Sequence, residues 1–208
     1  LGVLFVAGVP TRQFIIVFLI GLIGIVLLIT YVPWRWERII SFVDPWSDPF
    51  DKGYQLTLSL MSIGRGDWFG VGLGQSLMKM GYLPDAHTDF IFSILIEELG
   101  LLTGILIVGM LFGISFRVFL IGRQSLQRKN HFGFFFCFGA AILIGLHIFI
   151  NVGVATGLLP TKGLTLPLFS AGGTNILIMC SMIGLILRID YENKVSMPIA
   201  SVKRRVNF

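Results

Sequence analysis

Charged side chains are scarce in this 208-residue sequence, making up 13% of it, whereas 55% of the residues are hydrophobic. With a mean hydropathy of +0.86, this composition excludes an ordinary soluble domain. Cysteine is almost absent: Cys137 and Cys180 both lie in apolar runs, where a thiol behaves as a small hydrophobic group. The sequence therefore predicts neither a disulfide framework nor a cysteine-based zinc site.

Long apolar runs dominate what is present. They predict an all-α integral membrane protein, a polytopic helical bundle with transmembrane helices at about 13–34, 90–116, 132–159 and 165–187, because a spanning helix needs about 20 apolar residues. The apolar start at 1–9 predicts part of a fifth helix. It has no initiator Met, basic n-region or cleavage site, so we do not expect a signal peptide. We expect the chain to begin within a longer protein.

The basic residues predict the orientation of these helices. The connection 117–131 carries four cations and no acid, namely Arg117, Arg123, Arg128 and Lys129, and the tail 188–208 is also rich in Lys and Arg. Both segments are predicted to be cytoplasmic. The large loop at about 35–88 is then extracytoplasmic. Because the cations cluster beside membrane ends and not on one exposed face, no nucleic-acid partner is expected.

Asp89 is the most informative single residue, since it lies where the polar loop meets an apolar run. A carboxylate at the mouth of a membrane segment is costly unless it faces water, a partner or a substrate. On a helix, Glu97 lies about 80° round from Asp89 and Glu98 on the opposite face. Glu97 is predicted to line the same cavity, although both glutamates could instead charge the first turn of a helix.

Proline and glycine interrupt the start of the last span. Pro167 and the Gly172–Gly173 pair break an apolar segment, and broken backbone at membrane depth is tolerated where it is buried in protein or lines a cavity. Lys162, beside this break, is a compact cation suited to a diphosphate or to pairing with Asp89. The alternative is a lysine that reaches the interface with its long side chain.

Three further patterns leave alternatives open. Gly70, Gly72 and Gly74 lie in a loop and either bring backbone N–H groups to a phosphate or permit tight turns, which is the better interpretation. Asp85, His87 and Asp89 at alternate positions either form a metal corner or reflect polar loop chemistry. His147 and Asn151, four residues apart in an apolar span, are most simply an interhelical contact.

Several long motifs in a fixed order resemble the SEDS (shape, elongation, division and sporulation) family of bacterial cell-wall polymerases. They are Asp44-Pro-Trp-x-Asp-Pro-Phe50, Gly53-Tyr-Gln55, Tyr82-Leu-Pro-x-Ala-His-Thr-Asp-Phe-Ile-Phe92, Glu97-Glu-Leu-Gly100, Leu159-Pro-Thr-Lys-Gly-Leu-Thr-Leu-Pro-Leu168 and Arg188-Ile-Asp-Tyr191. The Pro-Thr-Lys-Gly-Leu-Thr string is closer to the division member of the family than to the elongation member. The likeness covers 1–208 as the C-terminal half of a single SEDS-type membrane domain.

One departure from the family pattern is visible. The chain reads Ser-Ala-Gly-Gly-Thr-Asn from Ser170, where the family usually reads Ser-Tyr-Gly-Gly-Ser-Ser. A tyrosine and two small hydroxyl residues are therefore replaced.

The resemblance implies a peptidoglycan glycosyltransferase that polymerises lipid II, the undecaprenyl-diphosphate-linked disaccharide pentapeptide, for septal wall synthesis in cell division. It implies a multi-pass protein of the bacterial cytoplasmic (inner) membrane at the septum, with its active site on the extracytoplasmic face. Asp89 matches the family's essential aspartate and is expected to be the catalytic base or the ligand of a divalent cation, Mg²⁺ or Mn²⁺.

In the same picture Lys162 binds the diphosphate, and His87, Glu97 and Ser170 line the cavity. The expected partners are lipid II, membrane lipid, a class B penicillin-binding transpeptidase and other divisome membrane proteins.

Two other functions fit parts of the pattern. In a lipid II flippase or other transporter, the acids and the broken helix would mark a translocation path, but no matching ionisable residue lies in the cytoplasmic half of the spans. In a non-catalytic scaffold for a cell-wall synthase, Asp89 and Lys162 would form a structural pair.

Overall fold

A computed structural model of the chain describes residues 2–8, 10–31, 42–51, 53–84 and 86–195. Its elements are, in order, α1 (Gly2–Val6), α2 (Thr11–Tyr31), α4 (Tyr54–Gly66), the short 3₁₀ helix η1 (Met78–Met80), α5 (Ile91–Leu99), α6 (Leu101–Gln127), α7 (His131–Ala155) and α8 (Gly173–Val195). The described part of the chain contains helices and no strands, so the predicted all-α fold class is confirmed.

Four of these helices, α2, α6, α7 and α8, are long and apolar enough to cross a membrane. They agree with the four predicted spans, and α1 is the predicted partial helix. The span expected at 90–116 is divided, because Gly100, with φ +86°, ends α5 and α6 begins at the next residue. A Cβ at Gly100 would lie 2.3 Å from the carbonyl oxygen of Trp68, so this close backbone contact requires glycine.

The last helix also starts later than predicted, at Gly173 instead of 165. The residues before it, including Pro167, are not helical, which agrees with a broken segment at this point.

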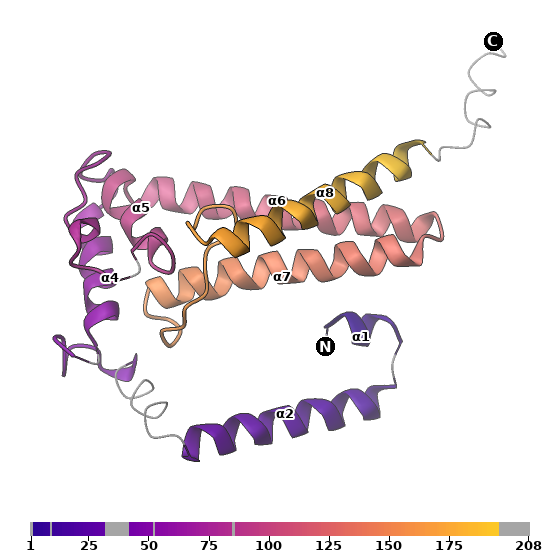
Figure 1. Cartoon of the computed structure of the whole chain (residues 1–208), viewed down its shortest axis with the longest axis horizontal. Helices are drawn as coiled ribbons and strands as arrows, with labels where there is room; N and C mark the ends of the chain where they lie inside the picture. Colours follow the sequence, from indigo (N-terminus) through magenta and orange to yellow (C-terminus); the bar gives the residue numbers. More distant parts are fainter. Residues whose placement is uncertain (1, 9, 32–41, 52, 85, 196–208) are drawn as a thin grey trace, which may run out of the picture.

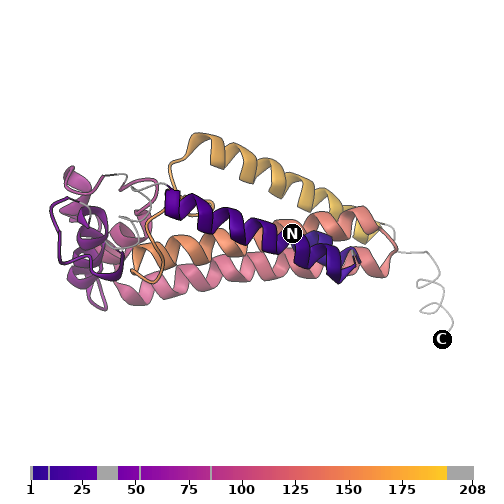
Figure 2. The same cartoon turned by 90° about the horizontal axis from the view of Figure 1, so that it is seen from below.

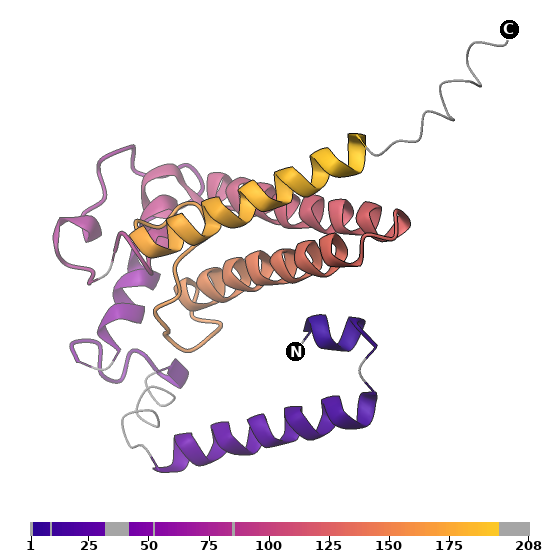
Figure 3. The ribbon, with the colours of Figure 1, turned by 45° about the vertical axis from the view of Figure 1, so that its right-hand side comes forward.

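Helices α6, α7 and α8 form a bundle (Figure 1), and two apolar clusters of buried residues hold it together. Polar contacts also join its helices: Ser115 of α6 donates to the Ala141 carbonyl of α7 at 2.7 Å, and Asn193 of α8 donates to Ser125 Oγ of α6 at 2.8 Å and to the Ile121 carbonyl at 3.4 Å. Helix α2 lies apart from this bundle (Figure 3) and its hydrophobic side chains are exposed.

The polar segments gather at one end of the bundle. Helices α4 and α5, η1 and the irregular residues before α8 share this end, while the α6–α7 turn and the end of α8 lie at the other (Figures 1 and 2). The four cations predicted to be cytoplasmic belong to the second half of α6 and the α6–α7 turn. The arrangement therefore fits the orientation predicted from charge, with Asp89 at the outer end.

This orientation is testable with single cysteines. After Cys137 and Cys180 are changed to alanine, we expect an impermeant thiol reagent outside intact spheroplasts to label Ser47→Cys and not Gln124→Cys, since both positions are exposed and lie at opposite ends of the bundle. Permeabilised cells, in which both cysteines should react, provide the control. The opposite labelling pattern would reverse the assigned topology.

Candidate functional site

Asp89 lies in a short irregular segment between the outer loop and α5. Its neighbours Ala86 and Phe90 are buried, 5% and 3% exposed, in an apolar cluster with Leu83, Ile94 and Val154. His87 is exposed, and Thr88 and Asp89 are half-buried. The apolar residues on each side thus anchor the segment, while Asp89 stays partly accessible.

The segment that carries Asp89 is fastened to the residues that precede α8. The Ala171 N–H donates to the His87 carbonyl at 3.0 Å, and Ser170 Oγ donates to the Thr88 carbonyl at 2.5 Å. From α7, Asn151 Nδ2 donates to the Asp89 carbonyl at 2.9 Å and to the Leu164 carbonyl at 2.7 Å. Residues about 80 positions apart in the sequence therefore form one site.

The Asp89 carboxylate itself faces the loop that contains Lys162. A Cβ placed on Gly163 would lie 2.9 Å from Asp89 Oδ2, so the carboxylate lies against the backbone of this loop. Lys162 is exposed, an environment that suits either a binding cation or a lysine that reaches the interface. The structure thus places the Lys162 loop beside Asp89, while the roles of both residues stay predictions.

Ser170 is buried and joins the Asp89 segment to the residues before α8. It is 1% exposed, and its hydroxyl accepts a hydrogen bond from the Leu166 N–H at 2.7 Å while donating to Thr88. Both bonds are to the backbone. Its observed role is to hold the loop, and a cavity-lining role stays a prediction, as it does for His87.

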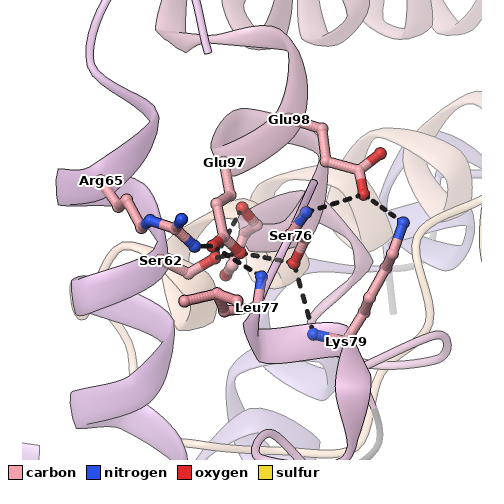
Figure 4. Close-up of polar contacts among 8 residues, drawn as sticks. Ser62, Arg65, Ser76, Leu77, Lys79, Glu97 and Glu98 are labelled. Atoms are coloured by element: carbon pink, nitrogen blue, oxygen red, sulfur yellow. Dashed lines mark hydrogen bonds and ion pairs between the residues drawn. The ribbon is translucent and has the colours of Figure 1, made fainter. Parts of the chain in front are cut away.

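Glu97 is wholly buried, with its carboxylate turned towards α4 and the residues around η1 (Figure 4). It accepts hydrogen bonds from Ser76 Oγ at 2.5 Å, Ser62 Oγ at 3.0 Å, Arg65 at 2.8 Å and the Leu77 N–H at 3.2 Å. These partners come from α4 and the loop before η1. Glu97 therefore joins three segments of the outer end, and its predicted place in a cavity beside Asp89 stays untested.

Burial alone would raise the pKa of Glu97, but the hydrogen bonds from Ser76, Ser62, Leu77 and Arg65 outweigh it and hold the pKa below its ordinary value. Burial likewise opposes the ionised form of Glu98, whereas a hydrogen bond from Lys79 at 2.5 Å favours it. The pKa of Glu98 is again lowered. Both glutamates lie at the end of α5. Their hydrogen bonds connect α5 to α4 and to the residues around η1. The two glutamates therefore do more than place charge in a helical turn.

Glu97→Gln is expected to lower the free energy of unfolding by roughly 3 kcal/mol, because an amide nitrogen would face hydrogen-bond donors in a buried site. Since the folded-state pKa is lowered, the stabilisation by ionised Glu97 is present above the ordinary carboxyl pKa and is lost as the pH falls from there through the lower folded value. Thermal unfolding of the solubilised protein against pH measures both effects.

The control is Glu192→Gln, which removes an exposed ion pair with Arg188 and should change stability by less than about 0.5 kcal/mol. Equal effects of the two substitutions would contradict a special role for the buried cluster.

The glycine run after α4 serves as a turn. Gly70, Gly72 and Gly74 all have positive φ, and the N–H groups of Val71 and Gly72 donate to the carbonyls of Glu97 and Glu98 at 2.9 and 3.0 Å. These N–H groups are therefore already paired within the chain, which favours the turn interpretation over a phosphate loop.

A protein-only metal site is not formed by the described residues, among which no three His, Cys, Asp or Glu side chains cluster. Asp85, a member of the suggested metal corner, lies outside them. A divalent cation at Asp89 therefore stays a prediction.

Two residues of this site were not predicted. Asn151 was interpreted as an interhelical contact together with His147, but His147 Nδ1 pairs with the Leu143 carbonyl of its own helix at 2.8 Å, whereas Asn151 reaches two loop carbonyls. Gly163 carries no chemical signal of its own. For Asn151, the sequence signal was an amide side chain inside an apolar span, close to the loop that carries the motif.

The fold and the site together define a multi-pass helical membrane protein with an acidic site at one end of its bundle. The model of the FTSW_RODA_SPOVE family of cell cycle proteins matches residues 1–195, and the chain belongs to this family. The resemblance to SEDS proteins is thereby confirmed.

Relatives share about half of the sequence positions. The chain is 47% identical to a probable peptidoglycan glycosyltransferase FtsW of Aliivibrio salmonicida over 195 residues, which cover 94% of this chain and 49% of that protein. It is 51% identical over 192 residues to the protein with the same name from Halorhodospira halophila, covering 92% and 48%. The chain thus spans about half the length of these relatives.

A solved structure shows the same fold. It comes from work described as "Structural coordination of polymerization and crosslinking by a peptidoglycan synthase complex", and it matches with a TM-score of 0.66 at 28% identity over 92% of this chain and 52% of the other.

Proposed function

We propose that this chain forms the half that carries Asp89 of a peptidoglycan glycosyltransferase that polymerises lipid II at the outer face of the bacterial cytoplasmic membrane, for septal wall synthesis. The observation that carries the proposal is the position of the Asp89 carboxylate, against the Lys162–Gly163 loop at the end of a membrane bundle. The names of the FtsW relatives support the reaction.

In the proposed reaction the acceptor sugar hydroxyl attacks the anomeric carbon of the donor. Asp89 takes the hydroxyl proton as the new glycosidic bond forms. The bond from the anomeric carbon to the diphosphate breaks, and the lipid diphosphate leaves with the electron pair. Lys162, whose loop contacts Asp89, stabilises the negative charge of that leaving group.

A divalent cation would add Lewis-acid stabilisation of the diphosphate when bound. Asp89 is the residue of the described chain that would contact it. The proposed proton transfer and the stabilisation of the leaving group use only side chains of this chain.

A class B penicillin-binding transpeptidase is the proposed partner, together with other divisome membrane proteins. The solved structure with the same fold belongs to a synthase complex that couples polymerisation to crosslinking, which supports a partner of this kind. Such a partner would crosslink the strands as they leave the outer end of the bundle.

The test is polymerisation of labelled lipid II by the purified protein in its natural length, with and without the transpeptidase, and with Mg²⁺, Mn²⁺ or EDTA. Glycan strands are the expected product. Transfer of labelled lipid II across vesicles without strand formation would favour the flippase. Neither transfer nor strands, with an active transpeptidase present, would favour the scaffold.

Gly163→Ala is expected to slow polymerisation by about tenfold with little loss of stability, because the added methyl group would displace the Asp89 carboxylate, the movable end of a side chain. Steady-state rates and thermal unfolding measure the two effects. Gly109→Ala is the matched control, since a Cβ there meets nothing within 4 Å. Wild-type rates in the Gly163 variant would show that the carboxylate position is not critical.

A further inference from the structure

The segment that carries Asp89 is held by hydrogen bonds from other parts of the chain to its backbone. The carbonyls of His87, Thr88 and Asp89 each accept a hydrogen bond, from Ala171 N–H, Ser170 Oγ and Asn151 Nδ2 respectively. The helix that follows begins only at Ile91. These bonds to α7 and the loop before α8 therefore fix the backbone that positions the carboxylate.

Asn151 is the central member of this arrangement. Its side chain is 1% exposed and donates to both the Asp89 and the Leu164 carbonyls. Leu164 follows Lys162 by two residues, and its N–H donates to the Lys162 carbonyl at 2.8 Å. One amide group thus sets the distance between the Asp89 backbone and the Lys162 loop.

Asn151 makes both hydrogen bonds with the N–H groups of its amide and neither with the amide oxygen. Among the described residues, Asn151 Oδ1 is buried without a hydrogen-bond partner. A side chain selected only to satisfy buried polar groups would not leave its own acceptor unpaired. The two N–H bonds are therefore what the site needs from this residue.

Ser170 repeats the same logic a short distance along the loop. Its hydroxyl donates to the Thr88 carbonyl and accepts from the Leu166 N–H, so it joins the Asp89 segment to the same loop that Asn151 holds at Leu164. Both residues act on backbone atoms and neither contacts the Asp89 carboxylate through a hydrogen bond that the structure describes.

We propose that Asn151 and Ser170 are positioning residues that hold the Asp89 segment and the Lys162 loop in the geometry required for glycosyl transfer. The proposal rests on the proposed function above, because it assigns these residues to that reaction. They are expected to affect turnover and not the affinity for lipid II, since a shift of about 1 Å in a reacting group can cost about a hundredfold in rate.

The first test is Asn151→Asp, which keeps the size of the side chain and removes both donors. We expect kcat to fall by about 10- to 100-fold with KM within about twofold. The matched control is Asn193→Asp: Asn193 is also buried and also donates to two acceptors, Ile121 O and Ser125 Oγ, but at the other end of the bundle. At equal membrane levels, similar losses of kcat in both variants would overturn the proposal.

A milder pair guards against loss of folding. Ser170→Ala removes the bond to Thr88, and Ser115→Ala removes a comparable buried bond to the Ala141 carbonyl between α6 and α7. We expect about a tenfold loss of kcat for Ser170→Ala alone. Equal, near-normal kcat in the two alanine variants would also overturn the proposal.

A third measurement does not depend on activity. In an Asp89→Cys background with Cys137 and Cys180 changed to alanine, the rate of labelling by a small maleimide reports the position of residue 89. Asn151→Asp should change this rate several-fold and Asn193→Asp should not. If the rate changes but the wild-type protein makes no glycan, the positioning is correct and the proposed function fails; an unchanged rate rejects the positioning itself.

Discussion

Asp89→Asn is expected to abolish lipid II polymerisation, with a loss of at least about 10²- to 10⁴-fold, the usual contribution of a general base. The substitution keeps the shape of the side chain and removes its charge and basicity. Folding and membrane insertion should be unchanged, because the hydrogen bonds that hold this segment use the backbone carbonyls of residues 87–89.

The measurement is the rate of glycan formation from labelled lipid II, normalised to the protein level in the membrane and to the thermal unfolding temperature. Glu192→Gln is a suitable control, since it removes an exposed ion pair with Arg188 in α8 and should keep the wild-type rate. Substantial polymerisation by the Asp89 variant would end its assignment as the base.

Lys162→Met should reduce polymerisation by about 10- to 100-fold, whereas Lys162→Arg should reduce it much less. Met keeps the apolar stem and removes the charge, while Arg keeps the charge in a wider head. A single charged contact to a departing diphosphate accounts for a loss of this size. Because Lys162 is exposed, neither substitution should affect folding.

Rates of strand synthesis for both variants, at matched protein levels, separate the two roles considered for this lysine. Lys129→Met, which removes an exposed cation at the opposite end of the bundle, is the control for a general effect of charge. Near-normal rates in both Lys162 variants would assign the residue to the membrane interface and leave Asp89 to carry the chemistry.

The number and type of spans follow from the sequence because the length of an apolar run is a local property. The division between α5 and α6 does not, since Gly100 differs little from other glycines inside apolar runs, and its role depends on the approach of the Trp68 carbonyl. The late start of α8 was indicated by Pro167 but its position was not fixed.

The sequence points to the motif residues of the candidate site, but it does not point to the residues that hold them in place. Asp89 and Lys162 stand in recognisable strings, whereas the partners of Glu97 lie 20 to 35 residues away in the sequence, and no periodicity connects them. Asn151 was noticed as a polar residue in a span, but its acceptors are main-chain carbonyls, which every residue carries. Sequence patterns therefore point to candidate chemical groups more readily than to the residues that hold them in place.

The hydrogen bonds to His87 and Thr88 also set an order for biosynthesis. Their donors, Ala171 and Ser170, are made some 80 residues after their acceptors, and chains emerge from the ribosome N-terminal end first. A nascent chain that has already inserted α6 and α7 has the Asn151 amide but still lacks the other two donors that hold residues 87–89. Chains that end before Ser170 would therefore enter the membrane with the Asp89 segment held at one of these three carbonyls.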